Sequence, residues 1–418
     1  MSWSQVSPNR WERPLVGMEQ HFILAGRAAA AHADGRENFI MSSKVKVDVD
    51  LPDMRYEEPD IAVLYEEDKK VYGTLDEKSL QEWLDATCIV SDAPDAEELC
   101  QAHRQYKQST LYSLPRSSEL VLLAHHATLE GIGLMMWWDK YLTALVNPRP
   151  DITFGDEHTR LAPPMEEALG YTPLTKQDLR DKAVSLMTQY TSRLPSIGLV
   201  SKIGQAAPRR CQNIEYRFSP ETTAAFIKGC KAKGVTVTSA VQAAYISMLL
   251  KHANPASNTS RYTTSCEFNL RPYLPAPHDK TAVCNYYLAQ ALNHYYKTTV
   301  SQNPEMLELA GYMCRAIADG VQTPEFQSAP VPTDSLVSSL GVVERYLQRE
   351  YEGKVVVKDY KIAVDIVLGM SMFHLYTFQD ELRLVYNFND AFEEPARIKV
   401  YLEDIEKILR KELLGSEN

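Results

Sequence analysis

The feature that most constrains the fold is a buried strand that leads through two histidines into a buried helix. Residues 119–124 form a short apolar run, Glu-Leu-Val-Leu-Leu-Ala, which predicts a strand inside the protein. Apolar and aromatic side chains also dominate the segment 132–142, so we expect a helix with protein on most sides. Between the two stand His125 and His126, with Glu130 four residues after His126. These polar groups need partners in an otherwise apolar junction.

The two adjacent histidines are expected to face in different directions. Consecutive side chains of a strand point to opposite faces of its sheet, so one imidazole must find buried partners while the other can face a cleft. A purely structural interpretation is also open, in which one histidine packs in the core and Glu130 stabilises the positive N-terminus of the helix. The residues alone leave both interpretations open.

The rest of the pattern mixes strands and helices in both halves of the chain, which predicts an α/β (α+β) protein. Alternating or apolar runs predict strands at 44–49, 213–218, 355–357 and 382–388. Amphipathic spacing and capping residues predict helices at 79–86, 176–193, 219 onward, 236–252 and 396–414.

The length of the chain and a stretch rich in proline and glycine predict two domains. Its 418 residues exceed the usual size of one domain and suit two of about 200 residues each. Proline and glycine punctuate the stretch 194–211, which contains Leu-Pro-Ser-Ile-Gly and Ala-Ala-Pro. We therefore expect an N-terminal lobe at 1–193, a crossover linker at 194–211 and a C-terminal lobe at 212–418.

Composition argues against several partners and locations. Asp and Glu outnumber Lys and Arg by 55 to 44, and the resulting net charge of −11 argues against nucleic-acid binding. No apolar run approaches the roughly 20 residues that span a membrane, and the first residues lack the apolar core of a secretory signal. Seven dispersed cysteines without a CxxC pair are typical of reduced thiols in a cytoplasmic protein. The other histidines fit no ligand spacing, so no metal site is expected.

The junction resembles the HHxxxDG signature of the CoA-dependent acyltransferase superfamily, with Glu130 in place of the aspartate. This superfamily includes chloramphenicol acetyltransferase, the condensation domains of peptide synthetases, plant BAHD acyltransferases and fungal trichothecene-type O-acetyltransferases. Three later segments are similar to family segments and follow in the same order, at 219–238, 269–286 and 386–387. The sequence looks most like the stand-alone fungal acyltransferases of secondary metabolism.

The resemblance implies two chloramphenicol-acetyltransferase-like lobes with mixed sheets flanked by helices, and an active-site tunnel between them. It makes His126 the general base, a role that suits an imidazole because it titrates near neutral pH. His125 would be held by backbone or side-chain acceptors, with direct catalytic assistance as the alternative. Glu130 would form a structural ion pair with Arg271, and Gly131 would allow close backbone approach at the helix start.

The same resemblance supplies candidates for the rest of the site and for the reaction. Ser371, His374 and Asn285 are candidates for an oxyanion donor or for the tunnel wall, with simple packing as the alternative. The implied reaction moves an acyl group, acetyl by default, from CoA or a carrier-protein thioester to a hydroxyl of a small secondary metabolite. It needs no bound cofactor and no acyl-enzyme, and the family default is a monomer. Cyclisation or chain release of a carrier-bound intermediate, or a non-catalytic carrier-docking role, are the alternatives.

Three departures from the family pattern bear on these expectations. Glu130 replaces an aspartate, so an extra methylene must be accommodated. Cys284 stands where the family has glycine before Asn285, and it would be strained if the backbone required a positive φ. The segment 50–58 is short and contains Pro52, which leaves room for two helical turns at most.

Overall fold

The computed structural model describes residues 2–31, 33–46, 58–74, 76–102, 105–148, 154–172, 174–257, 259–264, 266–281, 287–290, 304–324, 328 and 331–415. The chain forms two compact units. The first comprises Met1–Thr188, Phe268–Ser328 and Tyr346–Ile362, and the second comprises Gln189–Glu267, Ala329–Arg345 and Ala363–Asn418. Two stretches beyond residue 212 therefore belong to the unit that contains most of the N-terminal half, so the units are not simple halves of the sequence.

The first unit is built around a five-stranded sheet in the order β15-β3-β8-β7-β6. Its central strand β8 is buried at every residue, as its apolar sequence predicts. β3 runs antiparallel to β8 and places Ile40 opposite His125. The strands of this sheet are β3 (Ile40–Lys46), β6 (Cys88–Val90), β7 (Thr110–Leu114), β8 (Glu119–His125) and β15 (Asp359–Val364).

A four-stranded antiparallel sheet of order β1-β2-β5-β4 belongs to the same unit. It buries Arg13 and Lys70 against carboxylates: the Arg13 guanidinium lies 2.6 and 2.7 Å from the two Glu19 oxygens, and Lys70 Nζ lies 2.8 Å from Asp60 Oδ1. Because each cation has a carboxylate partner, its burial is tolerated. The strands are β1 (Ser4–Ser7), β2 (Arg10–Pro14), β4 (Leu64–Glu66) and β5 (Lys69–Gly73).

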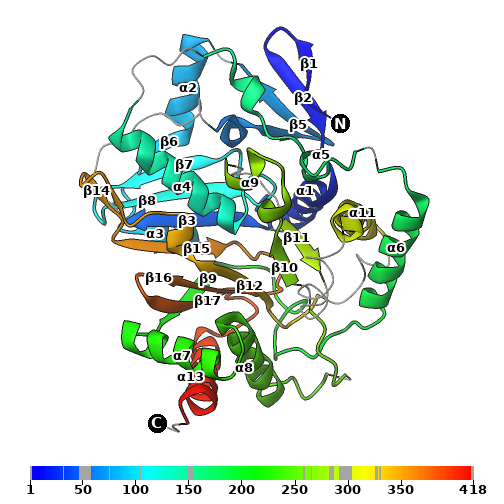
Figure 1. The fold of residues 1–418 in the computed structure, drawn as a ribbon, viewed down its shortest axis with the longest axis vertical. Helices are drawn as coiled ribbons and strands as arrows, with labels where there is room; N and C mark the ends of the chain where they lie inside the picture. Colours follow the sequence, from blue (N-terminus) through cyan, green and yellow to red (C-terminus); the bar gives the residue numbers. More distant parts are fainter. Residues whose placement is uncertain are drawn as a thin grey trace. The chain divides into compact units, whose positions relative to one another are not determined.

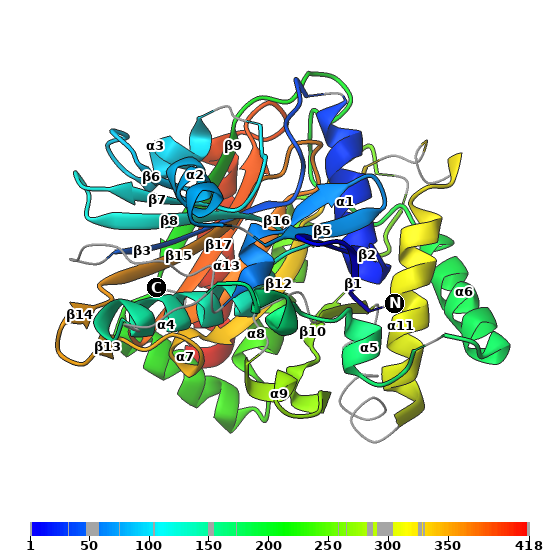
Figure 2. The ribbon, with the colours of Figure 1, turned by 90° about the horizontal axis from the view of Figure 1, so that it is seen from above.

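Helix α4 confirms the expectation of a helix surrounded by protein. Trp137 and Trp138 are almost completely buried, and the Trp138 indole donates a hydrogen bond of 3.0 Å to Ser43 Oγ. Helices α1 and α11 of this unit run side by side (Figures 1 and 2). The helices wholly or mainly in the first unit are α1 (Gly17–Ala30), α2 (Glu77–Thr87), α3 (Ala96–Gln101), α4 (Gly131–Val146), α5 (Met165–Ala168), α6 (Gln177–Thr191), α9 (His278–Thr281) and α11 (Pro304–Gly320).

The second unit contains a mixed sheet in the order β12-β16-β17-β9. β12 runs parallel to β16, whereas β17 is antiparallel to both of its neighbours, β16 and β9. Helices α7, α8 and α13 lie together on one face of this sheet (Figure 1). The elements are β9 (Cys211–Arg217), α7 (Pro220–Ala232), α8 (Val237–Lys251), β12 (Leu336–Val342), β16 (Met372–Phe378), β17 (Glu381–Asn389) and α13 (Pro395–Leu414).

Short elements complete the described chain. Two-stranded ribbons are formed by β10 (Cys266–Asn269) with β11 (Tyr287–Gln290) and by β13 (Glu350–Tyr351) with β14 (Val355–Val356). Single 3-10 turns are η1 (Pro59–Ala62), η2 (Glu157–Arg160), η3 (Arg271–Tyr273) and η5 (Val343–Arg345).

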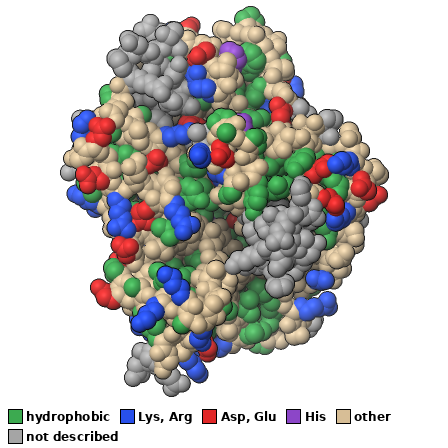
Figure 3. Space-filling view, viewed as in Figure 1, with side chains coloured by type: hydrophobic (Ala, Val, Ile, Leu, Met, Phe, Trp, Pro, Cys, Tyr) green, Lys and Arg blue, Asp and Glu red, His purple; other side chains and the backbone are tan. Residues whose placement is uncertain are grey.

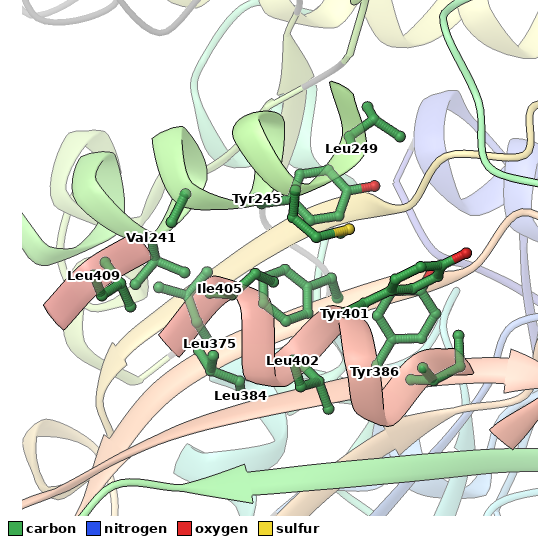
Figure 4. Close-up of a cluster of buried hydrophobic side chains, with 14 of the residues drawn as sticks. Val241, Tyr245, Leu249, Leu375, Leu384, Tyr386, Tyr401, Leu402, Ile405 and Leu409 are labelled. Atoms are coloured by element: carbon green, nitrogen blue, oxygen red, sulfur yellow. The ribbon is translucent and has the colours of Figure 1, made fainter. Parts of the chain in front are cut away.

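The core of the second unit forms where its helices meet the sheet. Leu402 and Ile405 of α13 face Val241 and Tyr245 of α8, with Leu384 of β17 in the same cluster (Figure 4). All five side chains are buried. The apolar face predicted for the C-terminal helix is therefore the face that packs on this sheet.

The mixed α/β class is confirmed, and so are most of the expected elements. Ser219 and Thr236 cap α7 and α8 as expected, accepting hydrogen bonds from the amides of Thr222 and Ser239. The strand expected at 44–49 begins earlier, at Ile40, and residues 47–49 lie outside the described part. The segment 50–58 also lies outside it, apart from Glu58.

The described surface carries charges of both signs. Acidic and basic side chains are interspersed on the face seen in Figure 3. Among the helices that the structure describes, none combines the length and apolarity that crossing a membrane requires.

Candidate active site

The two histidines lie where β8 ends and α4 begins. The carbonyl of His125 accepts hydrogen bonds from the amides of Thr128 and Leu129, at 2.8 and 3.2 Å, which closes a tight turn directly after the strand. The amide of His126 donates a hydrogen bond of 3.0 Å to the carbonyl of Phe39, the residue that precedes β3. Turn and neighbouring strand thus fix the backbone of both histidines before any side-chain contact is considered.

Glu130 forms the expected ion pair with Arg271 and also caps α4. Its Oε1 lies 2.5 Å from Arg271 Nη1, and both side chains are buried. Its oxygens accept hydrogen bonds of 2.9 Å from the amides of Ile132 and Gly133. Arg271 Nη1 also donates a hydrogen bond of 3.2 Å to Asn269 Oδ1. The longer glutamate side chain is therefore accommodated as an N-cap that also reaches the arginine.

Gly131 occupies the position at which close approach was expected. It is the first residue of α4, directly after the capping Glu130, and it is buried. Close backbone approach at Gly131 stays a prediction.

His125 is enclosed by side chains from distant parts of the first unit. Its Nδ1 accepts a hydrogen bond of 3.0 Å from the amide of Ala127, so the neutral ring carries its proton on Nε2. Nε2 lies 3.4 Å from Glu37 Oε2, a contact longer than a well-formed hydrogen bond. The hydroxyl of Tyr106 accepts a hydrogen bond of 3.1 Å from the His125 backbone amide. The ring thus accepts a hydrogen bond from a backbone donor, where acceptors were expected, and its contact with an acceptor, Glu37, is the longer one.

His126 packs against two phenylalanines. Its ring stacks on Phe22, with centroids 4.1 Å apart and planes inclined by 6°. Phe39 meets it edge-on, with centroids 6.5 Å apart and planes inclined by 82°. The residue is 6% exposed. The Phe22 face and Phe39 therefore both contribute to the orientation of this ring.

Two of the three candidates for the oxyanion donor belong to the second unit. Ser371 precedes β16 and donates a hydrogen bond to Glu393. His374, on β16, is 3% exposed, and its Nδ1 lies 2.9 Å from the amide nitrogen of Asn387. Burial lowers the pKa of His374 to about 4, so the ring is neutral at physiological pH. Asn285, like Cys284, lies outside the described residues.

The described residues contain no group of three or more His, Cys, Asp or Glu side chains placed to hold a metal ion.

The sequence of the chain is similar to those of known enzymes. No protein-family model matches the chain. It is 25% identical to the O-acetyltransferase pigM of Monascus ruber over 82% of this chain and 72% of that protein. It is 24% identical to the acetyltransferase pigO of the same organism over 99% of this chain and 98% of that protein.

A solved structure shares the fold. The TRI3 trichothecene 15-O-acetyltransferase of Fusarium sporotrichioides matches with a TM-score of 0.75 and 17% identity, covering 99% of this chain and 97% of that one. The chain has the CoA-dependent acyltransferase fold. The fungal relatives support an acyltransferase that takes an acyl donor and a small-molecule acceptor.

Sequence reasoning missed the side chains that enclose the histidines of this acyltransferase. Phe22 comes from α1, Glu37 and Phe39 from the approach to β3, and Tyr106 from the approach to β7. One signal was available: the segment 17–30 is rich in alanine and spaced like a helix, so α1 itself could have been predicted. Nothing local in the sequence indicates that its phenylalanine meets His126.

Proposed function

We propose that this acyltransferase moves an acyl group, acetyl by default, from CoA to a hydroxyl of a small secondary metabolite, with His126 as the general base. The observation that supports the proposal most directly is that both the backbone and the ring of His126 are held in place. Its amide donates a hydrogen bond to the Phe39 carbonyl, and its ring stacks on Phe22. A general base must be oriented toward the proton that it removes.

The proposed reaction is an addition followed by an elimination, through a tetrahedral intermediate. His126 takes the proton of the acceptor hydroxyl while the oxygen attacks the thioester carbonyl. The C–S bond then breaks, the ester is released, and the imidazolium returns the proton to the thiolate of CoA. Atoms and charge balance without an acyl-enzyme. An imidazole suits both halves because it gains and loses a proton near neutral pH.

The negative charge on the tetrahedral oxygen needs a hydrogen-bond donor. We propose His374 or Ser371 for this role. Asn387 donates to His374 Nδ1, so the neutral ring carries its remaining proton on Nε2 and can donate it. The Ser371 hydroxyl is engaged by Glu393, which makes it the less available of the two donors.

Glu130 and Arg271 are proposed to act on structure rather than on the substrate. Both oxygens of Glu130 accept hydrogen bonds from amides of α4, and one of them also lies 2.5 Å from the Arg271 guanidinium. This pair therefore holds the turn that presents His126.

The test is transfer activity with a panel of acyl-CoA donors and a fungal metabolite extract, read out by thiol release and by mass spectrometry of the products. His126→Gln keeps a polar side chain of similar size but removes the basic group, so we expect it to fold and to lose turnover about 100- to 10,000-fold. His158→Ala, which changes a histidine stacked on Trp11, is the matched control and should stay close to wild type.

Two outcomes would redirect the proposal. Full turnover by folded His126→Gln would remove the histidine from the base role. No transfer from any acyl-CoA, with products formed from carrier-bound thioesters instead, would favour the cyclisation or chain-release alternative. Binding of a carrier domain with no product of either kind would favour the docking alternative.

A further inference from the structure

We propose that Phe22 and Phe39 form an aromatic seat that sets the orientation of the His126 ring, and that both are positioning residues for acyl transfer. The inference deepens the proposed function and rests on it, since positioning matters only if His126 reacts. The seat itself is a geometric feature of the first unit, and it can be tested without any substrate.

Phe22 holds the ring by its face. Its ring and that of His126 are nearly parallel and 4.1 Å apart, a distance typical of direct stacking. Both rings are buried. A stacked ring can slide or turn in its own plane but cannot tilt, so the ring nitrogens of His126 stay in one plane at the ring edge.

Phe39 restricts the remaining freedom. It meets the His126 ring edge-on and also packs edge-on against Phe22, with centroids 5.3 Å apart. Its carbonyl accepts the hydrogen bond from the His126 amide. One residue therefore contacts both the backbone and the ring of His126, and these contacts together fix the side chain relative to its own backbone.

The backbone of Phe39 is itself unusual. Its φ is +64°, in the left-handed region that bulky residues rarely adopt. A glycine would fit there without strain, so the fold retains an aromatic side chain at a position where the backbone disfavours one. This strained residue is also the one whose carbonyl accepts the hydrogen bond from the His126 amide.

Helix α1 contacts both histidines. Phe22 and Gly26 are four residues apart and so lie on one face of α1. A Cβ at Gly26 would lie 3.0 Å from His125 Nε2 and 3.4 Å from Glu37 Oε2, so a side chain there would require these neighbours to move by a few tenths of an ångström. The same helix face thus stacks on His126 and abuts His125, and a shift of α1 would disturb both rings.

The first experiment observes the His126 ring directly. Histidine labelled with 13C at Cε1 is incorporated into the full-length protein, and the His126 signal is assigned as the one missing in His126→Gln. Stacking over the face of Phe22 shifts the ring proton upfield. We expect Phe22→Leu to move this signal downfield, Phe22→Tyr to keep it near wild type, and Ile23→Val to leave it unchanged as the control from the same helix.

The second experiment measures transfer by the same variants. We expect Phe22→Leu to lower kcat about 10- to 100-fold with KM within about twofold, because misplacing a base by an ångström weakens the reaction more than it weakens binding. Phe22→Tyr should recover most of the loss. A role in stability alone would lower the amount of folded enzyme but leave kcat per folded molecule unchanged.

A pair of variants separates the two contributions of Phe39. Phe39→Ala and Phe39→Gly both remove the ring, but only glycine adopts the positive φ without strain. We expect Phe39→Gly to keep the His126 amide bonded to the carbonyl and to lose less kcat than Phe39→Ala. Equal losses in the two variants would contradict the backbone part of the inference.

The outcomes for the seat and for the reaction are distinct. An unchanged His126 signal in Phe22→Leu would overturn the seat. A shifted signal with unaltered kcat would overturn the positioning role. A shifted signal in a protein that transfers no acyl group at all would leave the seat in place and overturn the proposed function.

Discussion

At the scale of single residues, the replacement of the family aspartate by Glu130 has a physical explanation. The longer side chain caps two amides of α4 and still reaches Arg271 at 2.5 Å. A buried carboxylate with three donors is satisfied, whereas either member of the pair would be stranded without the other. The pair therefore contributes more to keeping the turn in one conformation than to net stability.

This leads to a prediction for the pair. Glu130→Ala should lower the free energy of unfolding by about 3–5 kcal/mol, because it leaves the buried guanidinium unpaired and removes the helix cap. Arg271→Ala should cost a similar amount. The double variant should cost clearly less than the sum, since neither charge is then stranded. Urea unfolding of the four proteins measures the coupling, and strictly additive losses would show that the two side chains do not interact.

At the scale of elements, the packing of α1 against α5 and α11 buries a carboxyl that the proposed reaction does not use. Glu166, on α5, is 5% exposed, and a Cβ at Gly17 would lie 2.7 Å from its Oε1. Gly17 has a φ of +51°, so it meets both the steric and the backbone requirement for glycine at the start of α1. The same Cβ would lie 3.1 Å from Cβ of Cys314 in α11.

The buried carboxyl makes stability depend on pH. Burial raises the pKa of Glu166 to about 7, above its ordinary value of 4.5. Between these values the folded protein keeps a proton that the unfolded chain releases, so this contribution to stability is complete below pH 4.5 and is lost as pH rises through 7.

We therefore expect Glu166→Gln to flatten the fall in stability between pH 5 and pH 8 by about 2–3 kcal/mol. Urea midpoints at several pH values provide the measurement. Glu167→Gln, at the neighbouring position, is the charge-matched control and should retain the wild-type slope. A Glu166→Gln protein with the wild-type slope would contradict the assignment of the protonated carboxyl.

At the scale of the whole molecule, the two units differ in how they are assembled from the sequence. The second unit packs α7, α8 and α13 on one face of its sheet, and α13 comes last in the chain. The first unit takes in α11 and β15 from beyond residue 212, although its central strand and histidine loop lie near residue 125. Arg271 reaches Glu130 through such a late segment.

The final helix is expected to contribute heavily to the second unit. Leu402 is fully buried in the cluster of Figure 4, so Leu402→Ala should lower the free energy of unfolding by about 2–5 kcal/mol. Ile227 of α7 is 37% exposed, and Ile227→Ala should cost well under half of that. Thermal and urea unfolding compare the two, and similar losses would mean that α13 does not anchor this core.

The sequence by itself determined the elements whose signals are local. Capping residues and apolar spacing predicted α7, α8, α4 and α13, because each depends on residues within a few turns. The histidine motif and its resemblance also anticipated the Glu130–Arg271 contact. The oxyanion donor, by contrast, stays a prediction for Ser371, His374 and Asn285.

Only the tertiary structure decided what surrounds the histidines. Phe22 and Glu37 lie about a hundred residues before His126 in the chain, and no periodic pattern records which face of α1 will meet the end of β8. The positive φ of Phe39 and the raised pKa of Glu166 likewise arise from close packing of distant segments. Local sequence fixes where a helix or strand begins, whereas the environment of a side chain depends on every segment that folds against it.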